Sequence, residues 1–235
     1  MPTDSRPAPD IAQDATLPNP SFDAATRLRL RLLCVLLAVT AVAGAALSLL
    51  WPGGSDSGTV LTVDDVRSIR QAWWGMLMAG AVLTALQVPA QALVVLSLVR
   101  GRGATAATWG AAAMWIGVAL ETVGLAGFTT AYYFPSDPTI DGSASEAVFQ
   151  AIAHDHLHLL TIQIPGHLLL TIGIVVQAVA LLRARVTPAW IPLTSLAIVV
   201  TYAVPGSGAI GLVTTVPLLI ASLGLARCAW RRTTP

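Results

Sequence analysis

Long apolar runs, separated by short polar segments that carry arginines, constrain this chain more than any other feature. Most of the six runs reach about the 20 apolar residues that an α-helix needs to cross a bilayer. The composition agrees, because 55% of the 235 residues are hydrophobic, 11% are charged and the mean hydropathy is +0.72. A soluble domain carries more charge than this. The sequence therefore predicts an all-α polytopic membrane protein, a bundle of six transmembrane helices.

The membrane domain is predicted to cover residues 27–232, after a disordered N-terminal tail. Residues 1–26 are rich in Pro, Asp, Ala and Thr and lack apolar periodicity, so they cannot bury a core. Thr62-x-x-Asp65 is typical of a helix start, and the segment from Pro205 to Gly208 is predicted to break the chain before the last span. The spans are predicted at about residues 32–51, 71–99, 105–133, 157–182, 188–204 and 209–230.

The arginines predict the orientation, because basic residues near span ends are retained in the cytoplasm. Only Arg67 and Arg70 fall on the external side of a six-span arrangement, so both termini are predicted to be cytoplasmic. The absence of lysine and the abundance of Ala, Leu and Val favour a bacterial plasma membrane. The arginines assigned to the cytoplasmic side are Arg27, Arg29, Arg31, Arg100, Arg102, Arg183, Arg185, Arg227, Arg231 and Arg232.

The predicted partner is therefore the lipid bilayer. A net charge of +1 with dispersed arginines argues against a nucleic-acid partner. Protein partners cannot be read from the sequence, and self-association into a homo-oligomer stays open.

The fourth span is predicted to be part of a long helix that contains all the histidines. Ser143-x-x-Glu146 can form a capping box, so this helix is expected to begin near Ala144 and to be kinked or broken at Pro165. On a continuous helix His154 and His158 stand one turn apart.

Together with Asp155, the two outer histidines could bind zinc or copper if a carboxylate of the external loops, Asp137 or Asp141, completed the site. The alternative is an interfacial polar turn in which His154, Asp155 and His158 bind no metal. We predict no cofactor, because bis-histidine haem ligation needs a histidine on a second span and none is present.

Glu121 is the most unusual residue, because an ionised carboxylate at bilayer depth costs at least about 2.5 to 3.5 kcal/mol. It must be protonated, paired or placed in a wet cavity. Gly110, Gly117 and Gly124 repeat every seven residues on about the same helical face, which is typical of a packed helix seam. Glu121 is therefore expected to point at protein, either as a proton or cation site or as a protonated group hydrogen-bonded to a neighbouring helix.

Glu121 and His167 are predicted to meet. Counted from Tyr133, Glu121 lies about 18 Å below the outer interface, and His167 lies about 16 Å deep if the fourth span enters the membrane near His156. Glu121, His167 and several glutamines of the second and fourth spans lie at successive depths and could form a continuous line of polar side chains, a polar thread, across the membrane. Most of these polar side chains are expected to serve as packing contacts between helices. The residues of this candidate site are Glu121, His167, Gln163, Gln87, Gln91 and Gln177.

The basic turn after the fourth span, Ala180-Leu-Leu-Arg-Ala-Arg-Val-Thr-Pro-Ala-Trp190, resembles the corresponding turn of uncharacterised bacterial six-span membrane proteins. The resemblance covers the second half of the chain and implies no activity. His-Glu-x-x-His and Gly-x-Ser-x-Gly motifs are absent. The leading hypothesis is a non-enzymatic multi-pass protein; the alternatives are a small permease or proton-linked channel that uses Glu121 and His167, and a metal-dependent membrane enzyme.

Overall fold

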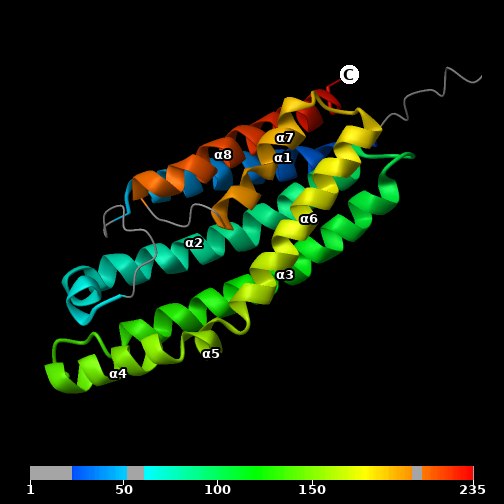
Figure 1. The fold of residues 1–235 in the computed structure, drawn as a ribbon. Helices are drawn as coiled ribbons and strands as arrows, with labels where there is room; N and C mark the ends of the chain where they lie inside the picture. The colour runs from blue at the N-terminus through cyan, green and yellow to red at the C-terminus, as the bar shows by residue number, and fades with distance from the viewer. Residues whose placement is uncertain (1–22, 52–60, 203–207, 235) are drawn as a thin grey trace, which may run out of the picture.

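A computed structural model describes residues 23–51, 61–202 and 208–234, and every regular element within these ranges is helical (Figure 1). The predicted tail before residue 23 and the predicted breaker from Pro205 to Ser207 lie outside the described residues. The elements, in chain order, are α1 (Ala24–Leu49), α2 (Val63–Leu98), α3 (Ala104–Tyr133), α4 (Gly142–His154), α5 (His156–Leu160), α6 (Gln163–Ala184), α7 (Trp190–Ser195), the 3-10 helix η1 (Leu196–Tyr202) and α8 (Gly208–Arg231).

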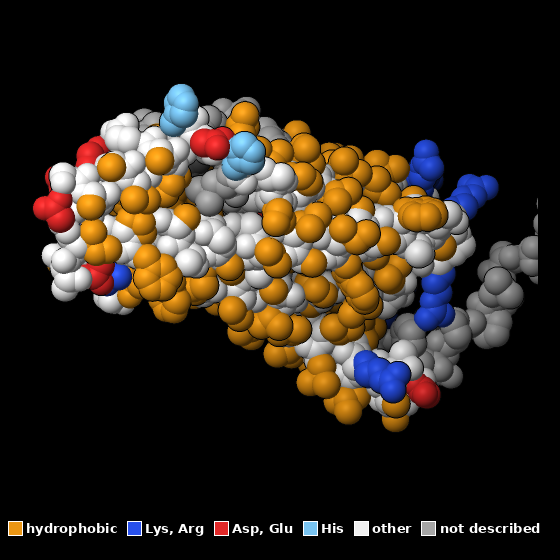
Figure 2. Space-filling model, turned by 90° about the horizontal axis from the view of Figure 1, so that it is seen from below, with side chains coloured by type: hydrophobic (Ala, Val, Ile, Leu, Met, Phe, Trp, Pro, Cys, Tyr) orange, Lys and Arg blue, Asp and Glu red, His pale blue; other side chains and the backbone are white. Residues whose placement is uncertain are grey.

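Five helices of the described part are long and apolar enough to cross a membrane: α1, α2, α3, α6 and α8. All of them have one terminus at the same end of the bundle, which we call the basic end because the arginines of the helix termini gather there (Figure 2). Most carboxylates lie at the opposite end, which we call the far end. The apolar side chains between the two ends form the surface that a bilayer would cover, so the multi-pass prediction is confirmed at this level.

Helices α1 and α8 run antiparallel along their whole length. At the basic end the Arg31 guanidinium donates to the Thr233 hydroxyl and carbonyl at 3.1 and 3.0 Å. Near the far end the hydroxyls of Ser48 and Thr215 lie 3.4 Å apart. The start of α8 therefore lies beside the end of α1, at the opposite end of the bundle from Ala184, where α6 ends.

Apolar side chains pack in three clusters along the bundle. The basic-end cluster joins α1, α2, α3, α6, α7 and α8 around residues such as Leu37, Leu98 and Leu225. The middle cluster includes Val118 of α3, Leu170 of α6 and Ile198 of η1, with further members from α2. The aromatic cluster lies at the far end and joins α2, α3 and α4.

Ring contacts hold the aromatic cluster together. Trp73 lies against Phe128 and Tyr132 with centroid distances of 6.3 and 6.4 Å, and Phe149 of α4 lies 5.1 Å from Tyr132. Trp73 is only 3% exposed, so it contributes to the core and does not face lipid. These contacts fix the antiparallel register of α2 and α3.

The two arginines at the far end fasten α2 to the end of α3, to the loop after it and to the start of α4. Arg70 lies 3.0 Å from the Asp137 carboxylate, donates to the Tyr133 carbonyl and stacks over the Tyr133 ring. Arg67 donates to the Ser145 hydroxyl at 3.1 Å. These partners explain why two arginines depart from the distribution of the others.

Two helix starts test the capping predictions. The start at Thr62 and Asp65 is confirmed as a capping box, and α2 begins at Val63, ahead of the span predicted from about residue 71. It therefore has 36 residues, about 54 Å, which exceeds the hydrocarbon thickness of about 30 Å. Helix α4 begins close to the predicted position, but its N-cap is Asp141, which accepts from the backbone N–H groups of Ser143 and Ala144, so the Ser143–Glu146 box is wrong.

The predicted continuous histidine helix is also wrong. It is interrupted at Asp155, between α4 and α5, and again at residues 161–162, before α6. Pro165 is the third residue of α6, where its missing N–H costs no intrahelical hydrogen bond. The break predicted at this proline is therefore present, but it falls three to four residues before Pro165, at residues 161–162, where the proline ring would clash with a helical Thr161 carbonyl.

The predicted fifth span, residues 188–204, is not one long helix. Its described part contains the 6 residues of α7 and the 7 residues of η1, which together cover about 23 Å at the rises of α- and 3-10 helices. Ile, Val and Thr dominate η1 and favour a regular α-helix less than Ala or Leu. The described residues thus contain five helices of membrane-spanning length, and the sixth predicted span is not confirmed.

Candidate intramembrane site

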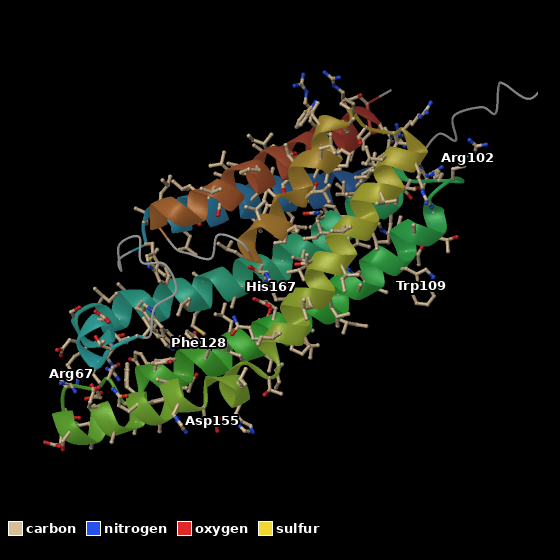
Figure 3. The ribbon with its side chains drawn as sticks, in the orientation of Figure 1. Arg67, Arg102, Trp109, Phe128, Asp155 and His167 are labelled. Atoms are coloured by element: carbon tan, nitrogen blue, oxygen red, sulfur yellow. The ribbon has the colours of Figure 1, made fainter. Side chains whose placement is uncertain are left out.

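Glu121 of α3 and His167 of α6 form a pair inside the bundle. Glu121 Oε1 lies 3.6 Å from His167 Nδ1, so the predicted meeting of these two side chains is confirmed. Their side chains are 16% and 29% exposed, respectively. Figure 3 shows His167 midway along the bundle, whereas Asp155 lies on its outside near the far end.

Glycines hold the two helices close enough for this contact. A Cβ at Gly166 would lie 2.5 Å from the Glu121 backbone nitrogen, and a Cβ at Gly124 would lie 2.6 Å from Gln163 Cβ. A Cβ at Gly117 would collide with the backbone nitrogen of Leu170. The seven-residue glycine repeat is therefore the α3–α6 seam that the sequence predicted.

The pair lies between the middle cluster and the aromatic cluster, in a layer that is less apolar than either. The rings of Trp73 in α2 and Tyr132 in α3 are in contact. Thr84 lies about 11 residues, or about 16 Å, from Trp73 along α2, and Glu121 lies the same distance from Tyr132 along the antiparallel α3. Thr84 is therefore placed at the level of Glu121. We call Thr84, Glu121, Thr122, Gln163 and His167 the polar layer.

Two oxygens of the polar layer accept no hydrogen bond from the described residues: Glu121 Oε2 and Gln163 Oε1, both of which are buried. The Thr122 hydroxyl does not supply one, because it donates to the Val118 carbonyl at 2.7 Å. Buried acceptors are nearly always satisfied by protein or water. A water molecule, or a proton on Glu121, would therefore satisfy acceptors of the polar layer that no described residue satisfies.

Few other titratable side chains occur in the apolar parts of α2, α3 and α6. Between Gln71 and Val99 the sequence of α2 contains no titratable side chain, and Glu121 and His167 are the only acid and the only histidine of α3 and α6. The pair is neutral overall as carboxylate with imidazolium or as carboxylic acid with imidazole. Gaining or losing one proton changes its net charge, so protonation is the chemistry that these two residues can perform together.

The helix ends agree with only part of the count behind the predicted meeting. Glu121 lies 12 residues, or about 18 Å, before the end of α3 at Tyr133, as counted from the sequence. Helix α6 begins at Gln163 and not near His156, so His167 lies only about four residues, or about 6 Å, from the start of α6. The two residues therefore lie at different distances from the outer ends of their helices.

The predicted polar thread is not continuous. Gln87 Nε2 donates to the Ser222 hydroxyl of α8 at 3.3 Å, and Gln177 Nε2 donates to the Ala92 carbonyl of α2 at 3.4 Å. Gln177 is 1% exposed. Among the described residues no hydrogen bond joins Gln87 or Gln177 to the Glu121–His167 pair, and Gln91 is half-buried in α2. These amides act as packing contacts between helices.

The predicted metal residues do not lie on one helix face, because the break at Asp155 separates His154 from His158. Asp155 Oδ1 lies 2.6 Å from His158 Nδ1, and this hydrogen bond raises the pKa of His158. In the described part of the chain no three His, Cys, Asp or Glu side chains form a group that could hold a metal ion. The continuous helix on which the metal hypothesis depends is not present.

Sequence reasoning missed the group that Arg70, Tyr133 and Asp137 form at the far end. Hydrogen bonds from Thr139, with a smaller contribution from Arg70, lower the pKa of Asp137. The sequence did contain a signal for this group: Arg67 and Arg70 depart from the positive-inside pattern, and acidic residues that could pair with them follow the third predicted span. Comparison with protein families, curated proteins and solved structures finds no match for this chain.

Proposed function

We propose that the chain crosses the bacterial plasma membrane six times, with both termini in the cytoplasm. Support comes from the positions of two helix ends. Helix α6 ends at Ala184 at the basic end, whereas Thr215, in the first third of α8, lies beside Ser48 toward the far end. The chain between them passes from one end of the bundle to the other. Helices α7 and η1 cover about 23 Å, about 7 Å less than the hydrocarbon thickness, and this shortfall does not change the connectivity.

Reporter fusions test this topology. Reporters after Arg102 and Arg185 are expected to be cytoplasmic, and one inserted at Gly142 is expected to be external, because positive-inside retention acts on the arginine-rich end. External labelling at Arg102 would overturn the six-crossing arrangement.

We further propose that the protein is a small proton-linked permease rather than an enzyme, and that Glu121 and His167 bind the transferred proton. The observation that carries this proposal is the 3.6 Å contact between the two side chains inside the membrane-spanning bundle. Intramembrane ionisable residues are costly and mark ion or proton pathways more often than not. A purely structural contact would be cheaper to make from apolar residues of similar volume.

Interrupted helices next to the pair support transport. The chain enters α6 through the short α5, and η1, whose Ile198 packs in the middle cluster beside Leu170, is a 3-10 helix. Irregular backbone at membrane depth is tolerated where it is covered by protein or lines a wet cavity, and broken helices beside a binding site are typical of transporters.

Purified protein in liposomes tests the proposal. An internal pH-sensitive dye reports proton entry driven by a valinomycin-imposed membrane potential. We expect flux above that of protein-free liposomes, and we expect Glu121→Gln and His167→Gln each to abolish it, because each removes one proton-binding group.

Matched controls are Glu146→Gln and His154→Gln, which change the same residue types outside the membrane-spanning helices. Glu146 only accepts a hydrogen bond from Gln150 of its own helix, and His154 is exposed at the end of α4. Both controls should keep the flux of the unchanged protein. Flux equal to that of protein-free liposomes, or flux that survives Glu121→Gln and His167→Gln, would contradict the proposal.

A further inference from the structure

We infer that water and small cations reach the Glu121–His167 pair from the external side only, and that apolar packing closes the site toward the cytoplasm in this structure. If the pair binds a transferred proton, as the proposed function states, this access defines the side from which the proton binds. The inference concerns access alone, however, and can be tested without any transport assay.

Exposure falls sharply from the pair toward the basic end. The side chains of Glu121 and His167 are 16% and 29% exposed. One turn further toward the basic end, Val118 and Leu170 are each 5% exposed, and Met114 of the next turn is fully buried. The middle cluster therefore begins directly below the pair.

Distance adds to this barrier. Glu121 lies about 17 residues, or about 26 Å, from the start of α3 at the basic end, and His167 lies equally far from the end of α6. Most of the hydrocarbon thickness of about 30 Å thus separates the pair from the basic end. The buried amide of Gln177 does not bridge this distance, because it is bonded to the Ala92 carbonyl.

The backbone contacts of the seam leave no passage between α3 and α6 on the basic side. A Cβ at Gly110 would lie 2.9 Å from the Gly173 carbonyl oxygen, and a Cβ at Gly173 would lie 2.7 Å from the Gly110 carbonyl oxygen. Helix backbones this close exclude water between them. On the side of η1, Ile198 packs in the same middle cluster.

The external side differs, because the aromatic cluster that closes the far end contains no residue of α6 among its described members. Gln163, which begins α6, has a buried Oε1 without a donor, and Glu121 Oε2 is in the same state. Lipid tails offer no hydrogen-bond donor, so an enclosed water or a proton on Glu121, and not lipid, would satisfy these two buried acceptors. The His167 side chain is 29% exposed and lies about one helical turn from the start of α6, so the external route runs along the start of α6.

Cysteine labelling tests the access. The natural thiols, Cys34 and Cys228, are first replaced by serine. Gln163→Cys and His167→Cys are then introduced separately and treated with a membrane-impermeant, cationic methanethiosulfonate in right-side-out spheroplasts and in inverted vesicles. Gln163→Cys leaves the Glu121–His167 pair intact, so it keeps the test informative if His167→Cys fails to fold.

Three control positions calibrate the labelling. His154→Cys, exposed at the end of α4 and outside the membrane-spanning helices, should react only in spheroplasts. Arg102→Cys, exposed at the basic end, should react only in inverted vesicles. Gln177→Cys lies in the closed region and should react slowly from both sides.

We expect Gln163→Cys and His167→Cys to react from outside at least about tenfold faster than Gln177→Cys, because a thiolate needs water and a closed apolar core holds none. Labelling from the cytoplasmic side, or from neither side, would overturn the inference. The outcomes also separate the two proposals: external labelling without proton flux contradicts the permease alone, whereas proton flux with cytoplasmic labelling contradicts the access alone.

Discussion

Glu121→Gln and His167→Gln, alone and together, give the sharpest measure of the intramembrane pair. Both substitutions keep side-chain volume close to the original and remove the ability to carry charge. Each single variant leaves the other ionisable group in the membrane without its partner, which costs more than losing the contact itself. The double variant removes both charges and therefore avoids that cost.

The magnitude follows from the distance and the exposure. At 3.6 Å the Coulomb energy is about 5 kcal/mol for an effective dielectric constant of about 20. Partial exposure of both side chains and the cost of desolvation reduce this value, so we expect a coupling free energy of about 1 to 2 kcal/mol, within the range measured for residues in contact. For a chain of this size such a coupling corresponds to about 2 to 8 °C in Tm.

Thermal unfolding in detergent, followed by circular dichroism, supplies the four Tm values of the cycle. We expect each single variant to unfold at a lower temperature than the unchanged protein and the double variant to lose clearly less than the sum. The cycle of Glu146→Gln and His154→Gln should be additive, because no contact joins these two side chains among the described hydrogen bonds and ion pairs. Strictly additive losses for Glu121 and His167 would refute a direct interaction.

Three further predictions concern the seam, the outer histidines and metal. Gly117→Ala should destabilise the protein by about 1 to 3 kcal/mol, because the added Cβ would meet the backbone of α6. Gly127→Ala should not destabilise it, because no atom lies within 4 Å of the added Cβ. Equal Tm values for the two variants would contradict the close packing of α3 on α6. The His158–Asp155 contact raises the pKa of His158, so its stabilising effect should be complete at pH values below the unfolded pKa of about 6.5 and should be lost as the pH rises through the folded pKa. In an NMR titration, Asp155→Asn should lower the pKa of His158. An unchanged pKa would exclude the contact. Purified protein should retain no stoichiometric zinc or copper after dialysis; metal that persists and disappears in the double variant His154→Ala, His158→Ala would restore the metal hypothesis.

Hydrophobic run length and glycine spacing predicted much of the helical fold. The third span, expected at about residues 105–133, is Ala104–Tyr133. The glycine repeat correctly predicted which face of α3 meets another helix, because glycine removes the side chain that would keep two backbones apart. Both signals are local properties of the sequence with a direct physical meaning.

Helix interruptions were harder to predict, because they depend on tertiary contacts. Pro165 is an obvious breaker, yet the first break falls at Asp155, whose carboxylate binds His158 and whose backbone has left the helical conformation. Similarly, Asp141 caps α4 in place of Ser143, since two N–H groups can reach its carboxylate. Hydrogen bonds from the Ser143 hydroxyl and the Ala144 backbone also lower the pKa of Asp141, a signature of a carboxylate used as a cap.

The extent of the candidate site could be predicted only in part. Depth along a helix follows from counting residues, but the direction in which an amide points depends on which helices flank it. Gln87 and Gln163 share a polar stripe pattern, yet Gln87 binds Ser222 on α8 while Gln163 packs against Gly124 on α3. The sequence does not show which helices lie next to each other, so the predicted thread joined residues that lie in different helix interfaces.

The meeting of Glu121 and His167 was predicted correctly although the fourth span was counted from His156 and α6 begins at Gln163, and the reason identifies a better reference point. The outer ends of α3 and α6 are not level with each other, because Glu121 lies about 18 Å from the end of α3 whereas His167 lies only about 6 Å from the start of α6. At the basic end both helices stop beside arginines, which hold that end at the lipid headgroups. Glu121 and His167 each lie about 17 residues, or about 26 Å, from that shared end. Antiparallel helices anchored at one end bring equidistant residues together, so depth in such a bundle is best counted from its arginines.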